Sequence, residues 1–143
     1  MKLPFLSSLR PIHATFCVAA LAAATFAWSD EIKVTLSGTQ EVPPVTTSAT
    51  GSGTIMINAD KSVGGSVTTS GIAGVAAHIH EAAAGMNGPV IVPMTKSAEN
   101  TWTVIAGAKL TDSQYESYKT GKLYVNVHSA AYKGGEIRGQ LKP

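Results

Sequence analysis

Apolar and polar residues alternate along most of the chain after residue 32, which is the pattern of β-strands with one face in a core. The alternating segments are short and are separated by glycine, proline, asparagine and aspartate residues that favour turns. The segments with this pattern are 33–36, 53–59, 63–69, 75–81, 90–94, 101–106, 122–129 and 136–142. Seven or eight such strands predict an all-β fold, a Greek-key sandwich or barrel of antiparallel strands.

One short helix is expected between the predicted strands 101–106 and 122–129. Thr111 and Gln114 are spaced as a capping box, in which each side chain bonds to the other residue's backbone N–H. Gly121 suits the left-handed end of a helix, so the sequence predicts a helix over 112–120. The segment 40–44 ends in two prolines and predicts a rigid loop, tied to the sheet by its amide and carboxylate side chains.

Residues 1–27 have the composition of a secretory signal peptide. Lys2 and Arg10 give a positive start, and the apolar stretch 14–26 follows and ends among small residues. This stretch is too short for a membrane-spanning helix; a retained N-terminal anchor is the alternative. We expect cleavage at the end of the segment, which leaves one domain of residues 28–143 in the periplasm or outside the cell.

Removal of this segment changes the charge and the cysteine content. The whole chain has 11 Lys and Arg against 9 Asp and Glu, and Lys2 and Arg10 account for the excess. The remaining domain is neutral, so neither a nucleic acid nor a membrane surface is an expected partner. The sequence does not indicate which protein, if any, is a partner. Cys17, the single cysteine, also lies in this segment, so the domain has neither a disulfide nor a thiolate for a structural zinc site.

The three histidines outside this segment lie on two of the predicted strands. His78 and His80 share one face of the strand 75–81, because alternate residues of a strand point to the same side. His128 lies on the corresponding face of the strand 122–129. The opposite face of each strand is apolar and belongs in the core, so we expect all three histidines on the outer face of the sheet.

This arrangement is suited to a metal ion. Histidines two apart in a strand have Cα atoms about 6.5–7 Å apart, and an adjacent strand lies about 4.8 Å away. If the two strands are neighbours, His78, His80 and His128 converge. Three imidazoles leave an open coordination position and suit copper, zinc, nickel or iron, with copper preferred by the affinity order of divalent ions. The alternative is that they are exposed strand residues without a ligand.

Other polar and sulfur-containing residues could assist such a site. Asn126 and Glu136 are expected beside the histidines, where a hydrogen bond could orient a ligand; a solvated amide is the alternative for Asn126. Arg138 could guide an anion toward a metal or pair with Glu136 or another carboxylate. Met86 and Met94 could offer a thioether to copper, although filling a loop and the core is the alternative.

Four segments, in this order, resemble the CHRD domain, which is named for chordin and also occurs in many bacterial secreted proteins. The segments are LSGTQEVPPVTTSATGSG, HIHEAAAGMNGPV, LYVNVHS and GGEIRGQL. The resemblance covers about 34–141 and implies a secreted domain. In chordin this domain belongs to an extracellular antagonist of growth factors, whereas many bacterial members stand alone without an assigned activity.

A second, weaker resemblance is to copper-zinc superoxide dismutase, a Greek-key β-barrel with copper outside the barrel. That family also has a His-x-His strand, a later Val-His strand and a glycine-rich final strand with an arginine. The resemblance implies His78 and His80 as one pair of copper ligands, His128 as a later ligand and Arg138, loosely, as the arginine that guides anions. The chain has no histidine for the bridging position, no zinc cluster and no cysteine pair, so no zinc subsite is expected.

Three functions follow as hypotheses. The first is an exported protein that binds a transition metal, copper preferred, through the three histidines. The second is a copper-only redox enzyme of the superoxide dismutase type, for which the sequence identifies no catalytic residue and offers Arg138 as an anion guide. The third is an extracellular protein-interaction module, as in chordin, in which the histidines are structural.

Overall fold

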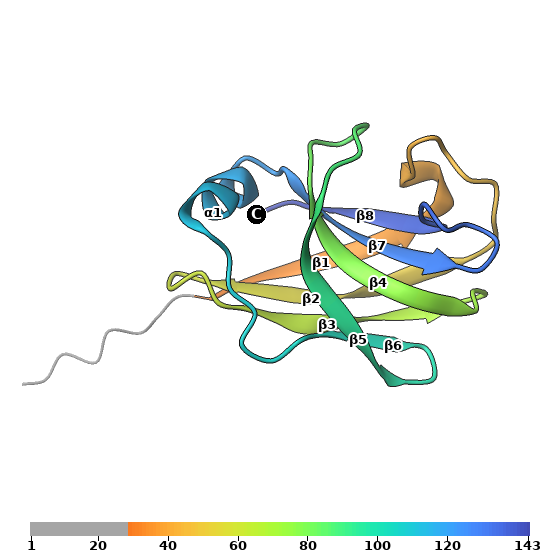
Figure 1. Cartoon of the computed structure of the whole chain (residues 1–143), viewed down its shortest axis with the longest axis horizontal. Helices are drawn as coiled ribbons and strands as arrows, with labels where there is room; N and C mark the ends of the chain where they lie inside the picture. The colour runs from red at the N-terminus through yellow and green to blue at the C-terminus, as the bar shows by residue number, and fades with distance from the viewer. Residues whose placement is uncertain (1–28) are drawn as a thin grey trace, which may run out of the picture.

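The structure, a computed structural model, describes residues 29–143 (Figure 1). It contains eight strands, one short 3₁₀ helix and one α-helix. These elements are β1 Ser29–Ser37, η1 Gly38–Gln40, β2 Thr50–Asn58, β3 Val63–Ser70, β4 Gly74–Glu81, β5 Val90–Ala98, β6 Thr101–Val104, α1 Asp112–Lys119, β7 Leu123–Ser129 and β8 Ile137–Leu141. The predicted signal peptide, 1–27, lies outside the described residues.

The strands close into a barrel in the order β1-β2-β3-β6-β5-β4-β7-β8, and every neighbouring pair is antiparallel. Strands β4, β5 and β6 are consecutive neighbours, and β7 returns beside β4, which is the Greek-key connection. The prediction of an all-β, Greek-key fold with one short helix is confirmed. Within residues 29–143, no helix has the length and apolar character needed to cross a membrane.

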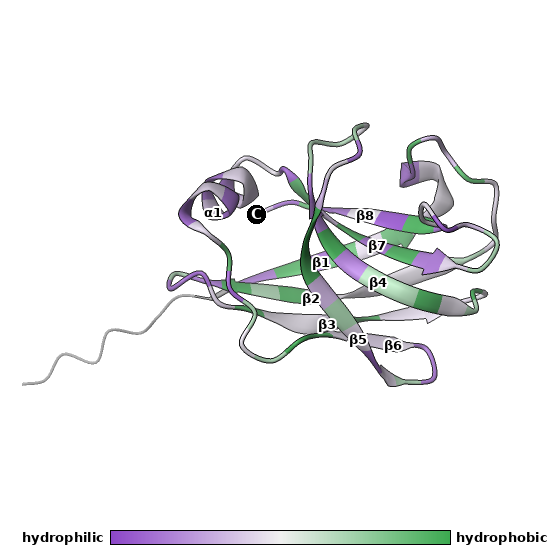
Figure 2. Ribbon diagram, in the orientation of Figure 1, coloured by the Kyte–Doolittle hydropathy of each residue, from purple (hydrophilic) through white to green (hydrophobic). Residues whose placement is uncertain are grey.

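The apolar faces of the strands fill the barrel, as the alternation predicted. Ile55, Ile79, Val125 and Val127 are at most 1% exposed, and hydrophobic and hydrophilic bands follow one another along β4 in Figure 2. Val75 is an exception, since the pattern placed it on the core face and it is 61% exposed. The pairing register of β4 and β7 shifts between Gly74 and Ala76, and this irregularity takes Val75 out of the alternation.

The short helix α1 begins as its sequence predicted. Thr111 accepts a hydrogen bond from the backbone of Gln114, and the Gln114 side chain accepts one from the backbone of Thr111. The helix ends at Lys119, one residue before the predicted end. Its partly apolar face packs on the barrel, where Tyr118 is fully buried.

Loops cover the outer face of β7 and β8, which the alternation alone left open to solvent. The loop after η1 carries Glu41, and the loop between β4 and β5 carries Asn87, whose Nδ2 donates to the carbonyl of Val42. Figure 1 shows both loops on the side of the barrel where β7 and β8 lie. As a result, Tyr124 and Asn126 of β7 are only 3% and 2% exposed although they point away from the core.

Candidate metal centre

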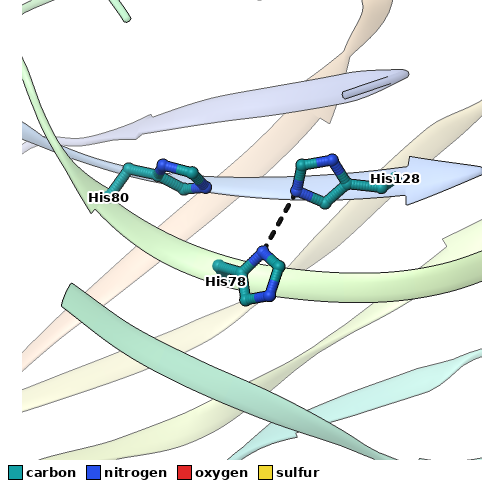
Figure 3. Close-up of side chains that lie close together, drawn as sticks. All are labelled: His78, His80 and His128. Carbon is teal, nitrogen blue, oxygen red and sulfur yellow. Dashed lines mark hydrogen bonds between the residues drawn. The ribbon is translucent and has the colours of Figure 1, made fainter. Parts of the chain in front are cut away.

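The three histidines lie on neighbouring strands, as the prediction required. Strands β4 and β7 pair with His80 opposite Tyr124, His78 opposite Asn126 and Ala76 opposite His128. His78 and His128 are therefore on diagonal positions of one ladder, on the outside of the barrel. Figure 3 shows the imidazole rings turned toward a common point above the two strands.

The distances within this histidine cluster are close to those of metal ligands. His78 Nδ1 lies 3.1 Å from His128 Nε2 (dashed in Figure 3), and one nitrogen from each of the three rings lies within 4.8 Å of the others. Imidazole nitrogens at about 2.0–2.1 Å from one ion are separated by about 3–4 Å. Side-chain rotations that move the ring nitrogens by about 0.5–1 Å would therefore bring the cluster onto one ion.

Backbone carbonyls fix the outer nitrogens of two of the rings. His80 Nδ1 lies 2.9 Å from the carbonyl oxygen of Gly88, and His128 Nδ1 lies 2.9 Å from that of Lys133. A carbonyl oxygen only accepts, so each Nδ1 carries the proton and each Nε2 presents a lone pair. Hydrogen bonds of this kind orient metal-binding histidines.

One of these lone pairs has no partner. His80 is 8% exposed, and its Nε2 is one of the two buried side-chain nitrogen or oxygen atoms that lack a hydrogen bond within residues 29–143. The Nε2 of His128, by contrast, accepts a hydrogen bond from His78 Nδ1–H. The cluster therefore contains one unsatisfied acceptor, His80 Nε2, and one hydrogen bond between two ring nitrogens, His78 Nδ1 and His128 Nε2. An ion bound by the three rings would lie between these atoms.

An aromatic platform holds His80 in place. The Tyr124 ring stacks on the His80 ring with 4.8 Å between centroids and 10° between planes. The Tyr124 hydroxyl accepts a 3.2 Å hydrogen bond from the backbone N–H of Gly88, whose carbonyl binds His80. Gly88 itself has no room for a side chain, because a Cβ there would overlap the carbonyl oxygen of Glu81. Neither Tyr124 nor Gly88 was predicted to take part, although Tyr124 shares the face of His128.

Burial keeps the rings in the form that binds metals. Burial lowers the pKa of His78, and the neighbouring His128 and His80 lower it further. Burial also lowers the pKa of His80; the hydrogen bond to Gly88 opposes this, and His128 and Arg138 add to it. Both rings are therefore neutral at pH 7, and neutral imidazole is the metal ligand.

Asn126 lies among the histidines but bonds elsewhere. Its Nδ2 donates to Oε1 of Glu41, which is 5% exposed, and its Oδ1 is the second buried atom without a partner in the described residues. Burial raises the pKa of Glu41 to about 7, against the lowering effects of Arg138, of the Val42 backbone and of Asn126. The predicted tie between the loop 40–44 and the sheet is present, because Gln40 Nε2 also donates to the carbonyl of Thr35.

The predicted pairing of Arg138 with Glu136 is wrong. Glu136 accepts a 2.8 Å hydrogen bond from the hydroxyl of Thr47, and no bond joins it to a histidine among the described residues. Arg138 is 1% exposed and donates through Nη1 to the carbonyl of Met86 and through Nη2 to that of Ala83. The β4–β5 loop folds over β8 and takes up the guanidinium, which therefore holds the loop and does not face solvent where an anion would approach.

Two further contacts complete the surroundings. The guanidinium carbon of Arg138 lies 3.5 Å from the centre of the Tyr124 ring, so the arginine, the tyrosine and His80 are stacked in series. Met94 packs in the core, where it is 6% exposed, and Met86 lies in the β4–β5 loop, where it is 62% exposed. These are the positions expected if neither methionine offers a thioether to a metal.

Comparison with known proteins gives one match. The family model described as CHRD domain matches residues 32–141, which is most of the chain and includes all three histidines. No curated protein and no solved structure matches the chain.

Proposed function

The chain belongs to the CHRD domain family, and from this premise we propose that it is an exported protein that binds a transition-metal ion, copper preferred, through His78, His80 and His128. The observation that carries the proposal is the unpartnered Nε2 of the buried His80. A buried polar atom without a hydrogen bond costs about 1–3 kcal/mol. An ion held jointly by the three rings would remove that cost.

The ligand chemistry supports copper over other ions. All three donors are imidazole nitrogens, which suit copper, zinc, nickel and iron, and copper has the highest affinity in the divalent series. The domain outside residues 1–27 has no cysteine, so the thiolate ligands of structural zinc sites are missing. Three protein ligands leave one position open on the ion, where a fourth, exogenous ligand can bind.

Export is supported by the composition of residues 1–27 and by the family. A positive start followed by an apolar stretch is typical of a signal peptide, and the CHRD domain is an extracellular type of domain. In an exported protein the ion would be bound in the periplasm or outside the cell.

Copper titration of the purified protein, with the ion supplied from a competing chelator, tests the proposal. Replacement of two of three ligands in the double variant His78→Ala/His128→Ala should weaken copper binding by at least about 100-fold, because the remaining ring cannot hold the ion alone. His13 is the single histidine outside the cluster, so His13→Ala in the unprocessed chain is the matched control and should bind as the wild type does. An unchanged affinity in the double variant would reject this site.

A further inference from the structure

We propose that the open position on the ion holds a small neutral ligand that can donate a proton in a hydrogen bond, with water as the simplest case, and that Asn126 Oδ1 is the acceptor for it. In this arrangement Glu41 is the positioning residue that holds the Asn126 amide in the required orientation. The inference rests on the proposed metal site and identifies the class of ligand that completes it.

The first argument is the position of the unsatisfied atoms. Within residues 29–143, the two buried side-chain atoms without a hydrogen bond are His80 Nε2 and Asn126 Oδ1. Asn126 stands directly opposite His78 in the β4–β7 ladder and two residues before His128 on the same face of β7. Side chains directly opposite in such a pair have Cβ atoms about 4.5–5.5 Å apart. Both unsatisfied atoms therefore belong to side chains on the same outer face of the β4–β7 ladder, beside His78.

The second argument concerns the partners that these two acceptors can take. The Nε2 of His80 presents a lone pair and needs an ion or a donor, whereas the Oδ1 of Asn126 needs a donor. A metal ion carrying a water molecule provides both at once, because the ion takes the nitrogen and the water O–H donates to the amide oxygen. Binding to a cation also makes the water a stronger donor.

The third argument is that the Asn126 amide is fixed. In the structure its Nδ2 donates to Oε1 of Glu41, so the amide nitrogen faces Glu41 and the amide oxygen faces away from it. Ionised Glu41 only accepts and therefore keeps the amide in this orientation. Gly135 packs against this pair, since a Cβ there would overlap both Asn126 Nδ2 and Glu41 Oε1. Replacing the amide by an apolar residue would leave the Glu41 carboxylate without this donor.

This geometry predicts which ligands the ion accepts. The oxygen of an amide carries partial negative charge, so it stabilises a ligand that has a proton to donate and disfavours an anion that has none, such as azide. The guanidinium of Arg138 is a cation that could attract an anion, but its Nη1 and Nη2 donate to the carbonyls of Met86 and Ala83. The site therefore favours water over simple anions.

Azide binding to the Cu(II)-loaded protein, followed by the azide-to-copper charge-transfer absorption, measures this preference. Asn126→Leu has nearly the same shape but no acceptor, so azide should bind roughly tenfold more tightly than in the wild type, the loss of one hydrogen bond to the competing water. Asn58→Leu is the matched control, because Asn58 bonds Ser62 at the far end of β2; it should bind azide as the wild type does.

Glu41 gives an independent test should Asn126→Leu fail to fold. Glu41→Ala removes the anchor and frees the amide to turn, so azide affinity should rise toward that of Asn126→Leu. Glu41→Gln keeps an acceptor for Asn126 Nδ2 and should restore the wild-type value to within about threefold. Equal azide affinity in the wild type, Asn126→Leu and Glu41→Ala, with copper still bound, would overturn this inference alone. Failure of the wild type to bind copper would overturn the proposed function and this inference with it.

Discussion

The buried carboxyl of Glu41 makes the stability of the metal-free protein depend on pH. Its contribution to stability decreases as the pH rises, whereas that of most acidic groups increases. Burial raises its pKa from 4.5 to about 7 in the folded protein. The folded chain therefore binds this proton more tightly than the unfolded chain does. Stability associated with Glu41 is fully present below pH 4.5, falls as the pH rises through 7, and is constant above that.

The size of this effect follows from the shift. One pKa unit corresponds to about 1.36 kcal/mol, so a change from 4.5 to about 7 corresponds to about 3 kcal/mol between pH 4 and pH 8.5. Glu41→Gln removes the ionisation and keeps both the shape and an acceptor for Asn126. We expect the variant to gain about 3 kcal/mol relative to the wild type as the pH rises from 4 to 8.5.

Urea unfolding at a series of pH values gives the free energy of unfolding of both proteins. The lowered pKa values of His78 and His80 destabilise the fold as the pH falls below their unfolded values, but this contribution is common to both proteins and cancels in the difference. Glu31→Gln is the matched control for the substitution itself, because Glu31 is an exposed carboxylate on β1. A flat difference for Glu41→Gln would refute the reasoning.

Three further predictions concern the histidine cluster. Copper affinity should fall with decreasing pH. Because burial lowers the pKa of His78 and His80, the fall should begin below about pH 6.5, the ordinary pKa of histidine. A chelator-competition series from pH 5 to 7.5 measures the affinity, and a constant affinity would exclude imidazole ligands. Tyr124→Leu removes the platform under His80 and should weaken copper binding by about 10- to 100-fold with the fold retained by circular dichroism; an unchanged affinity would show that the stacking does not orient the ring. Gly88→Ala places a Cβ against the Glu81 carbonyl and should lower the free energy of unfolding by at least about 2 kcal/mol; a smaller loss in urea unfolding would show that this loop adapts.

The alternation of side chains was sufficient to predict the faces of β7 and of β4 from Ala76 onward. Local rules also sufficed for the start of α1, because the capping residues Thr111 and Gln114 are only three apart. Alternation placed Val75 on the wrong face because it cannot predict the shift of register between Gly74 and Ala76. That shift depends on the partner strand, β7.

The cover over the site could not be predicted in the same way. Glu41 and Asn126 are 85 residues apart in the chain, and nothing in either segment indicates that they meet. Arg138 binds backbone carbonyls of the β4–β5 loop, and every residue has such a carbonyl, so no residue type marks the partner. Pairing with Glu136 was one of the alternatives that the sequence left for Arg138, and it is wrong because the β4–β5 loop takes up the guanidinium.

The order of strands in the barrel has a consequence for when the ion can be bound. His78 and His128 are 50 residues apart, and β5, β6 and α1 lie between them, so the third ring joins the other two only when β7 docks beside β4. Before β7 docks, the chain holds at most the pair His78 and His80 in place. If the protein binds an ion through all three rings, as proposed, the ion is taken from the compartment where the barrel finishes folding.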